Sequence, residues 1–218
     1  MTSLEYLCIN VEDELFNFYS FVQFPPNLKY LALYNVRNAA KILSWVAKGC
    51  KDLIGLRLDC ELTANGFQAI SRMKSLKYLD VPMSYDIGYV FEELTELRAI
   101  KIDTVNEMVV IVTSLQVIDA IKRYCNNLEH LNISGNRSDK ISAEIHANLL
   151  QLASLPCLCS LSIWASSYSK EQTTEFVNRL VANGNIQYIQ MATSKVPLEP
   201  EVLFEMLRRC KVDILIAY

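Results

Sequence analysis

The hydrophobic positions of this chain follow an uneven spacing that fits neither a helix nor a strand alone. Between Gly49 and Ile70, the residues Leu53, Leu56 and Leu58 are separated by steps of three and two. An amphipathic helix repeats its apolar positions every three or four residues, and a half-buried strand repeats them every two. The spacing therefore predicts that these leucines belong to a structural unit larger than one element.

The same apolar-x-x-apolar-x-apolar spacing returns along the whole chain. It occurs eight times, and successive units start 24, 25, 23, 21, 31, 30 and 28 residues apart. One match means little because leucine is common, but eight matches at a nearly regular period indicate an internal repeat. The units are Leu4, Leu7, Ile9; Leu28, Leu31, Leu33; Leu53, Leu56, Leu58; Leu76, Leu79, Val81; Leu97, Ile100, Ile102; Leu128, Leu131, Ile133; Leu158, Leu161, Ile163; and Ile186, Ile189, Met191.

The segments between these triplets predict helices wherever they are long enough. Apolar residues recur at helical spacing, and Gly49 stands where it would stop the first helix. A short strand followed by a helix in every unit predicts an α/β architecture. The expected helices cover residues 37–48, 63–73, 138–152 and 169–182, with an apolar segment at 107–124 and room for one or two turns around 85–93.

The segment Leu128-Glu-His-Leu131-Asn-Ile133-Ser-Gly-Asn136 carries a recognisable motif. It resembles the leucine-rich repeat, L-x-x-L-x-L-x-x-N/C-x-L. The resemblance implies a curved solenoid with a parallel inner sheet and helices on its convex side, formed by residues 1–218 as a single domain of eight to nine repeats. Other residue types replace the asparagine in most units, which predicts irregular turns: Val36, Glu61, Ser84, Val105, Ser166 and Ser194.

Cysteines refine this resemblance. Cys50 and Cys125 each stand three residues before the first leucine of a unit, and Cys210 has a similar place. These units resemble the cysteine-containing repeats of F-box/LRR proteins, the substrate receptors of cullin-based ubiquitin ligases. No F-box helices occur in the sequence, and the first and last units stand at its ends without capping segments. We therefore expect this chain to be part of a longer protein whose adaptor-binding region lies outside it; the alternative is a short protein whose ends a partner covers. The ninth unit has two possible registers, Ile214 with Ile216 or Ile216 with Tyr218.

Composition and charge exclude several function classes. The net charge is -3, and the sequence has no cluster of Lys and Arg of the kind that nucleic-acid binding requires, so we expect no nucleic-acid partner. No apolar run is long enough to span a membrane, and the first residues lack a basic segment and a cleavage site, so we expect neither a membrane span nor a secretory signal. Seven scattered cysteines are typical of reduced thiols, which predicts a cytoplasmic or nuclear protein.

Catalytic chemistry finds little support in the sequence. Only two histidines occur, His130 and His146, and no zinc spacing, Walker loop, dinucleotide fingerprint or nucleophile elbow is present. We expect His146 to be an ordinary surface or partly buried residue of a helix. The sequence thus predicts no enzymatic activity, no cofactor and no metal site.

Instead, the sequence predicts a binding surface on the concave face of the sheet. Side chains between the buried positions of each strand point to that face. Tyr, Trp and Arg anchor protein interfaces, so we expect a protein ligand there. The candidate residues are Tyr30, Tyr78, His130 and Tyr188 at third positions of the motif; Arg57, Asp80, Lys101 and Asn132 at fifth positions; and Tyr34, Asp59, Asp103 and Trp164 at seventh positions.

Several alternatives remain at this point. The charged residues of the face can pair with one another as solvated ion pairs, and tyrosines are common on parallel sheets. The chain can also be a scaffold or a fragment of an innate-immune sensor. A third class is a GTPase-activating or other enzyme-regulating solenoid, for which the sequence singles out no catalytic arginine. Substrate recognition in an F-box-type receptor is the interpretation that the resemblance favours.

Overall fold

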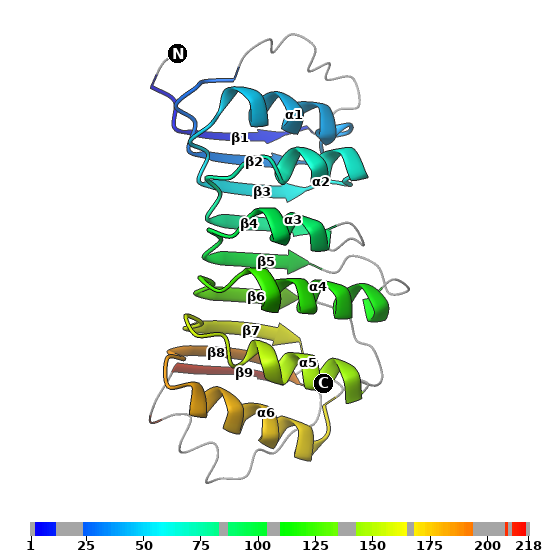
Figure 1. Ribbon diagram of the computed structural model, residues 1–218, viewed down its shortest axis with the longest axis vertical. Helices are drawn as coiled ribbons and strands as arrows, with labels where there is room; N and C mark the ends of the chain where they lie inside the picture. Colours follow the sequence, from blue (N-terminus) through cyan, green and yellow to red (C-terminus); the bar gives the residue numbers. More distant parts are fainter. Residues whose placement is uncertain are drawn as a thin grey trace.

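The computed structural model describes most of the chain. Its described ranges are residues 3–11, 24–82, 87–103, 110–134, 143–164, 168–193, 208 and 211–216. Within them the strands stack like rungs along the long axis of the molecule, and the helices form a second row beside them (Figure 1). This arrangement is the predicted α/β solenoid.

One sheet contains all the strands that the structure describes. It has nine strands in the order β1-β2-β3-β4-β5-β6-β7-β8-β9, and every neighbouring pair is parallel. Because no strand is out of sequence order, each unit packs only on the units before and after it. The strands are β1 (Tyr6–Asn10), β2 (Tyr30–Tyr34), β3 (Gly55–Asp59), β4 (Tyr78–Pro82), β5 (Ala99–Asp103), β6 (His130–Ser134), β7 (Ser160–Trp164), β8 (Tyr188–Thr193) and β9 (Lys211–Ile216).

Helices return the chain between strands, and each contacts the next one along the row. Their positions agree with the predicted segments, and the shortest, α3, falls in the shortest spacing between units. The helices are α1 (Ala39–Gly49), α2 (Ala64–Ile70), α3 (Gly88–Glu93), α4 (Val110–Tyr124), α5 (Ala143–Leu152) and α6 (Lys170–Asn183).

The register of the sheet aligns the same motif position in every unit. Leu56 pairs with Leu31 on one side and with Leu79 on the other, and Leu79 pairs with Ile100. These side chains are almost completely buried between the sheet and the helices. In β1 the equivalent Leu7 is only half-buried. The apolar spacing in the sequence therefore defines one continuous core.

A tight turn precedes most strands and explains the cysteine position. The backbone N–H of the first leucine of a unit donates to the carbonyl three residues earlier, as from Leu128 to Cys125 (3.1 Å). Cys50 and Cys125 are buried at this position, and Met73 and Leu94 occupy it in other units and are buried as well. The cysteine thus acts as a small apolar residue under the turn.

Several helix boundaries differ from the sequence-based prediction, and α2 ends at Ile70 rather than at residue 73. The first helix starts at Ala39 rather than residue 37, because Asn38 adopts a left-handed conformation (φ 59°) that an α-helix excludes. Gly49 is itself the last residue of the helix, one residue beyond the predicted end, and Cys50 is its C-cap. The predicted start at residue 138 lies outside the described residues, as do Asn136 and Cys210.

The ninth strand has neither of the two registers considered from the sequence. Val212 pairs with Ile189, and Ile214 pairs with Met191. The apolar positions of this unit are therefore Val212 and Ile214. Both earlier registers placed them further along the chain, where Ile216 instead pairs with Thr193.

Candidate functional site

A groove of about 370 Å³ runs along the concave face of the sheet. It is lined by the third and fifth motif positions of successive strands, which alternate with the buried leucines. Eight of the twelve candidate residues lie in this lining. They are Tyr30, Arg57, Tyr78, Asp80, Lys101, His130, Asn132 and Tyr188.

Tyrosine rings dominate the first half of the groove. Tyr6, Tyr30 and Tyr78 are 61%, 40% and 43% exposed, and no other large hydrophobic side chain in the described residues except Tyr89 is comparably open. The rings of Tyr6 and Tyr30 lie 6.2 Å apart at a tilt of 34°. We call these three residues the tyrosine platform. Their aromatic rings are accessible because they are not packed into the core.

Gly55 sets the position of one ring of this platform. A Cβ atom at residue 55 would lie 2.5 Å from Cδ1 of Tyr30, which is closer than real contacts allow. The Tyr30 ring therefore lies against the bare backbone of β3. Without a side chain at 55, the ring covers the sheet instead of standing away from it.

Four charged side chains form a network of ion pairs, the charged network, across β3, β4 and β5. Arg57 Nε lies 3.2 Å from Asp80 Oδ2, and Lys101 Nζ lies 3.5 Å from Asp80 Oδ1 and 2.6 Å from Asp103 Oδ2. The Arg57 guanidinium also lies 5.3 Å from the centre of the Tyr34 ring. Cross-strand pairing of these charges, one of the alternatives drawn from the sequence, is therefore present.

The pKa values of Asp80 and Lys101 reflect the partial burial of the charged network. Burial raises the pKa of Asp80, although Lys101 and Arg57 oppose that effect. For Lys101, burial lowers the pKa, but the hydrogen bond to Asp103 and the charge of Asp80 outweigh it, so the pKa lies above its usual value. Lys101 thus stays protonated at neutral pH, and Asp80 is the member whose charge is costly to keep.

The seventh motif positions lie at the carboxyl ends of the strands, outside the groove lining. Tyr34, Asp59 and Asp103 are the last residues of β2, β3 and β5, and Trp164 is the last residue of β7. The side chain of Trp164 is outside the described part of the chain. These residues form a rim at one edge of the groove.

The groove includes residues that the candidate set omitted. Tyr6 has the most exposed ring of the platform, and Ser162 Oγ donates to Gln190 Oε1 (2.8 Å) on the next strand. All three stand at third or fifth motif positions, so the spacing alone was sufficient to find them.

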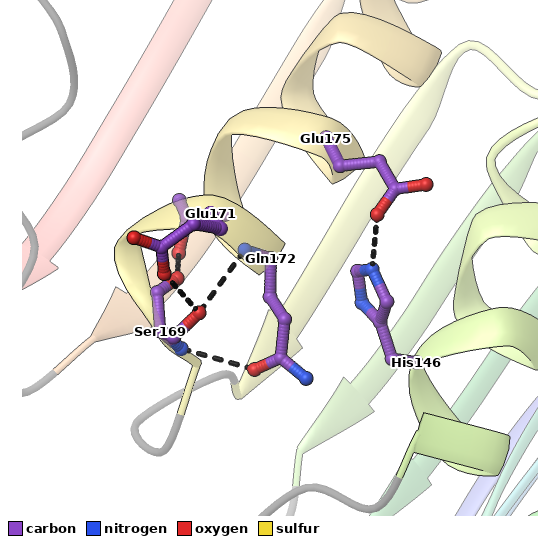
Figure 2. A network of polar contacts seen from close by, with 6 residues as sticks. His146, Ser169, Glu171, Gln172 and Glu175 are labelled. Carbon is purple, nitrogen blue, oxygen red and sulfur yellow. Dashed lines mark hydrogen bonds and ion pairs between the residues drawn. The ribbon is translucent and has the colours of Figure 1, made fainter.

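The second histidine has a structural environment on the convex side. His146 on α5 is 8% exposed, and its Nε2 lies 3.0 Å from Glu175 Oε2 on α6, as Figure 2 shows. Its ring meets Tyr168 edge-on at 5.4 Å. This contact joins two neighbouring repeats, and His146 is more deeply buried than the sequence predicted.

The described residues offer no metal centre and no pair of bonded cysteines. No group of three or more His, Cys, Asp or Glu within the described ranges is arranged to hold a metal ion. The six cysteines described there are free thiols, namely Cys8, Cys50, Cys60, Cys125, Cys157 and Cys159. Among the helices of the described part, none has the length and apolar character to cross a lipid bilayer.

Comparison with known proteins supports the fold. No family model matches the sequence, and no curated protein matches it. A chain from the structure of the Toll–Spatzle complex of Drosophila, in its glycosylated form, is similar with a TM-score of 0.55 and 12% identity. The similarity covers 97% of this chain and 30% of that one. At this identity the likeness shows a shared solenoid fold, and this chain spans less than a third of that chain's length.

Proposed function

We propose that this chain is a protein-binding module that holds its partner in the concave groove. The observation that carries the proposal is the tyrosine platform, three exposed rings on β1, β2 and β4 that line a groove of about 370 Å³. Tyrosine is a frequent interface anchor because it buries a large area with few rotatable bonds. The similar Drosophila chain is described as part of a protein complex, which agrees with an interaction role for this fold.

We further propose that the bound protein is the substrate of an F-box-type ubiquitin ligase receptor. The support is the resemblance of the cysteine-containing repeats, together with the burial of Cys50 and Cys125 under equivalent turns. In this proposal the ligase adaptor binds a region outside this chain. The free thiols of the described residues agree with action in the cytoplasm or nucleus.

Comparison of a groove variant with a matched surface variant tests the binding proposal. The double substitution Tyr30→Ala with Tyr78→Ala removes two platform rings. Tyr89→Ala removes an exposed ring from helix α3, outside the groove lining. We expect quantitative capture from cell lysate to lose a defined set of proteins with the double variant and to retain it with Tyr89→Ala. Equal melting temperatures are the control for folding.

Further variants extend this experiment to the rim, with Trp164→Ala, and to the charged network, with the pair Arg57→Ala and Lys101→Ala. Loss of the same proteins, with unchanged melting temperatures, would identify these residues as part of the interface. If every captured protein is retained by all groove and rim variants, the concave face is not the binding surface.

The ligase proposal has a separate test. Overproduced in cells, this chain should compete with the intact receptor for its substrates without carrying the adaptor-binding region. We expect the half-lives of the groove-bound proteins to lengthen, and the Tyr30→Ala/Tyr78→Ala chain to have no such effect. Unchanged half-lives of proteins that do bind the groove would remove the ligase role and leave the binding role intact.

A further inference from the structure

The charged side chains around the groove differ in whether they form ion pairs with one another. Both cations of β3 and β5 are already engaged, since Arg57 contacts Asp80 and Tyr34, and Lys101 contacts Asp80 and Asp103. Each therefore has little attraction left for a further anion. An incoming acidic group would also meet the carboxylates of Asp80 and Asp103 beside these cations.

Asp59 differs from the other carboxylates of this region. It is exposed at the end of β3, and it takes part in no ion pair within the described residues. Its strand neighbour in the register is Tyr34. Three carboxylates, Asp59, Asp80 and Asp103, stand against the two cations, so this group of five side chains has a net negative charge.

The tyrosine platform also favours a positively charged group on the partner. The face of an aromatic ring carries negative electrostatic potential, and a guanidinium stacks on it more readily than any other charged side chain. The sheet already contains one such contact, between Arg57 and the Tyr34 ring at 5.3 Å. Tyr30, which lies against Gly55, and Tyr78 expose their rings on the strands that flank β3.

We infer that the partner inserts a basic segment into the first half of the groove, anchored by an arginine that stacks on the tyrosine platform and reaches toward Asp59. This inference rests on the proposed function and names the chemistry of the partner at the same surface. Acidic and phosphorylated segments and nucleic acids are disfavoured, because their charge has the same sign as the unbalanced carboxylate. An uncharged segment would leave Asp59 without a counter-charge.

Selection from a random peptide library against the intact chain tests the inference. We expect the selected peptides to be enriched in arginine relative to the library and depleted in Asp and Glu. For a selected peptide, replacing its arginine by glutamine should weaken binding about tenfold, because both the ring contact and the charge are lost.

Variants of the chain locate the contact. Asp59→Asn keeps the size of the side chain and removes its charge, and it should weaken binding about threefold to fivefold, with a smaller effect at high salt. Tyr78→Ala should weaken binding more strongly, and Tyr89→Ala should leave it unchanged. Melting temperatures of all variants verify that the fold is intact.

The outcomes separate this inference from the proposed function. Selected peptides without basic residues that still lose affinity for the Tyr78→Ala chain would overturn the basic-partner inference and keep the groove as a binding site. Peptides that bind Tyr30→Ala and Tyr78→Ala chains as tightly as the unmodified chain, or a library that yields no binder, would overturn both.

Discussion

At the scale of single residues, one strand divides its side chains between the core and the groove. Leu79 is 2% exposed and lies between Leu56 and Ile100 in the buried ladder. The adjacent Asp80 points to the opposite face, where Arg57 and Lys101 contact its carboxylate. Neighbours in sequence therefore have very different roles in stability.

Substitutions at these two residues should differ sharply. Leu79→Asp would bury a carboxylate without a partner and should lower the free energy of unfolding by about 4 kcal/mol or more. Asp80→Ala removes partly exposed ion pairs and should lower it by about 1 kcal/mol or less. Urea unfolding measures both. Equal losses would contradict the register of the sheet.

The thiols should also divide by position. Burial raises the pKa of Cys125 to about 12 and that of Cys60, next to the charge of Asp59, to about 11. At pH 8 such thiols hold almost no reactive thiolate. Iodoacetamide should therefore modify the exposed Cys8 and Cys157 in the native protein, and Cys125 only after unfolding. Peptide mass spectrometry reads the order, and equal rates for Cys8 and Cys125 would contradict the structure.

At the scale of elements, the helices differ in how they begin. Helix α6 starts with a complete capping box, in which Ser169 Oγ accepts from the Gln172 N–H and the Gln172 side chain accepts from the Ser169 N–H (Figure 2). Helix α2 has Thr63 at the same place with no hydrogen bond from its side chain. The two N-caps therefore form a natural matched pair.

Replacing each cap by alanine should show this difference. Ser169→Ala should lower the free energy of unfolding by about 1 kcal/mol, because it leaves a backbone N–H of the first turn without its acceptor. Thr63→Ala should have little effect, since no such bond is lost. Thermal and urea unfolding of the two variants give the comparison, and a larger loss for Thr63→Ala would be the contrary result.

At the scale of the whole molecule, stability comes from contacts between successive units. The sheet order and the row of helices connect each unit to its neighbours. The His146–Glu175 contact adds a polar connection between α5 and α6, beside the packing of the His146 ring on Tyr168. Disturbing one such interface should affect nearby units more than distant ones.

Hydrogen exchange can test this locality. His146→Ala leaves a cavity beside Tyr168 and should lower the stability by about 2 kcal/mol, whereas Glu175→Ala should lower it by less, because Glu175 is 63% exposed. Amide exchange in His146→Ala should speed up in α5 and α6 and stay unchanged in α1 and α2. A uniform increase along the chain would show that the solenoid unfolds as one cooperative unit.

The accuracy of sequence-based prediction differed between the core and the turns. Leu56 and Leu79 were assigned to the core correctly because the same buried position recurs in every unit, so each unit supports the assignment in the others. The start of α1 was misplaced because one residue, Asn38, takes a left-handed conformation that its neighbours do not indicate. The ninth strand was misplaced because Val212 and Ile214 lie in a unit with no clear first leucine.

The sequence by itself determined the solenoid, its register through eight units and the residues of the concave face, because burial of the repeated leucines is the dominant energy and is written at fixed spacing. Only the tertiary structure decided which charges pair, that Tyr30 lies against Gly55, and that Asp59 lacks an ion-pair partner among the described residues. Those contacts join side chains of different units. They depend on the distance between strands and on side-chain rotamers, which no local pattern records.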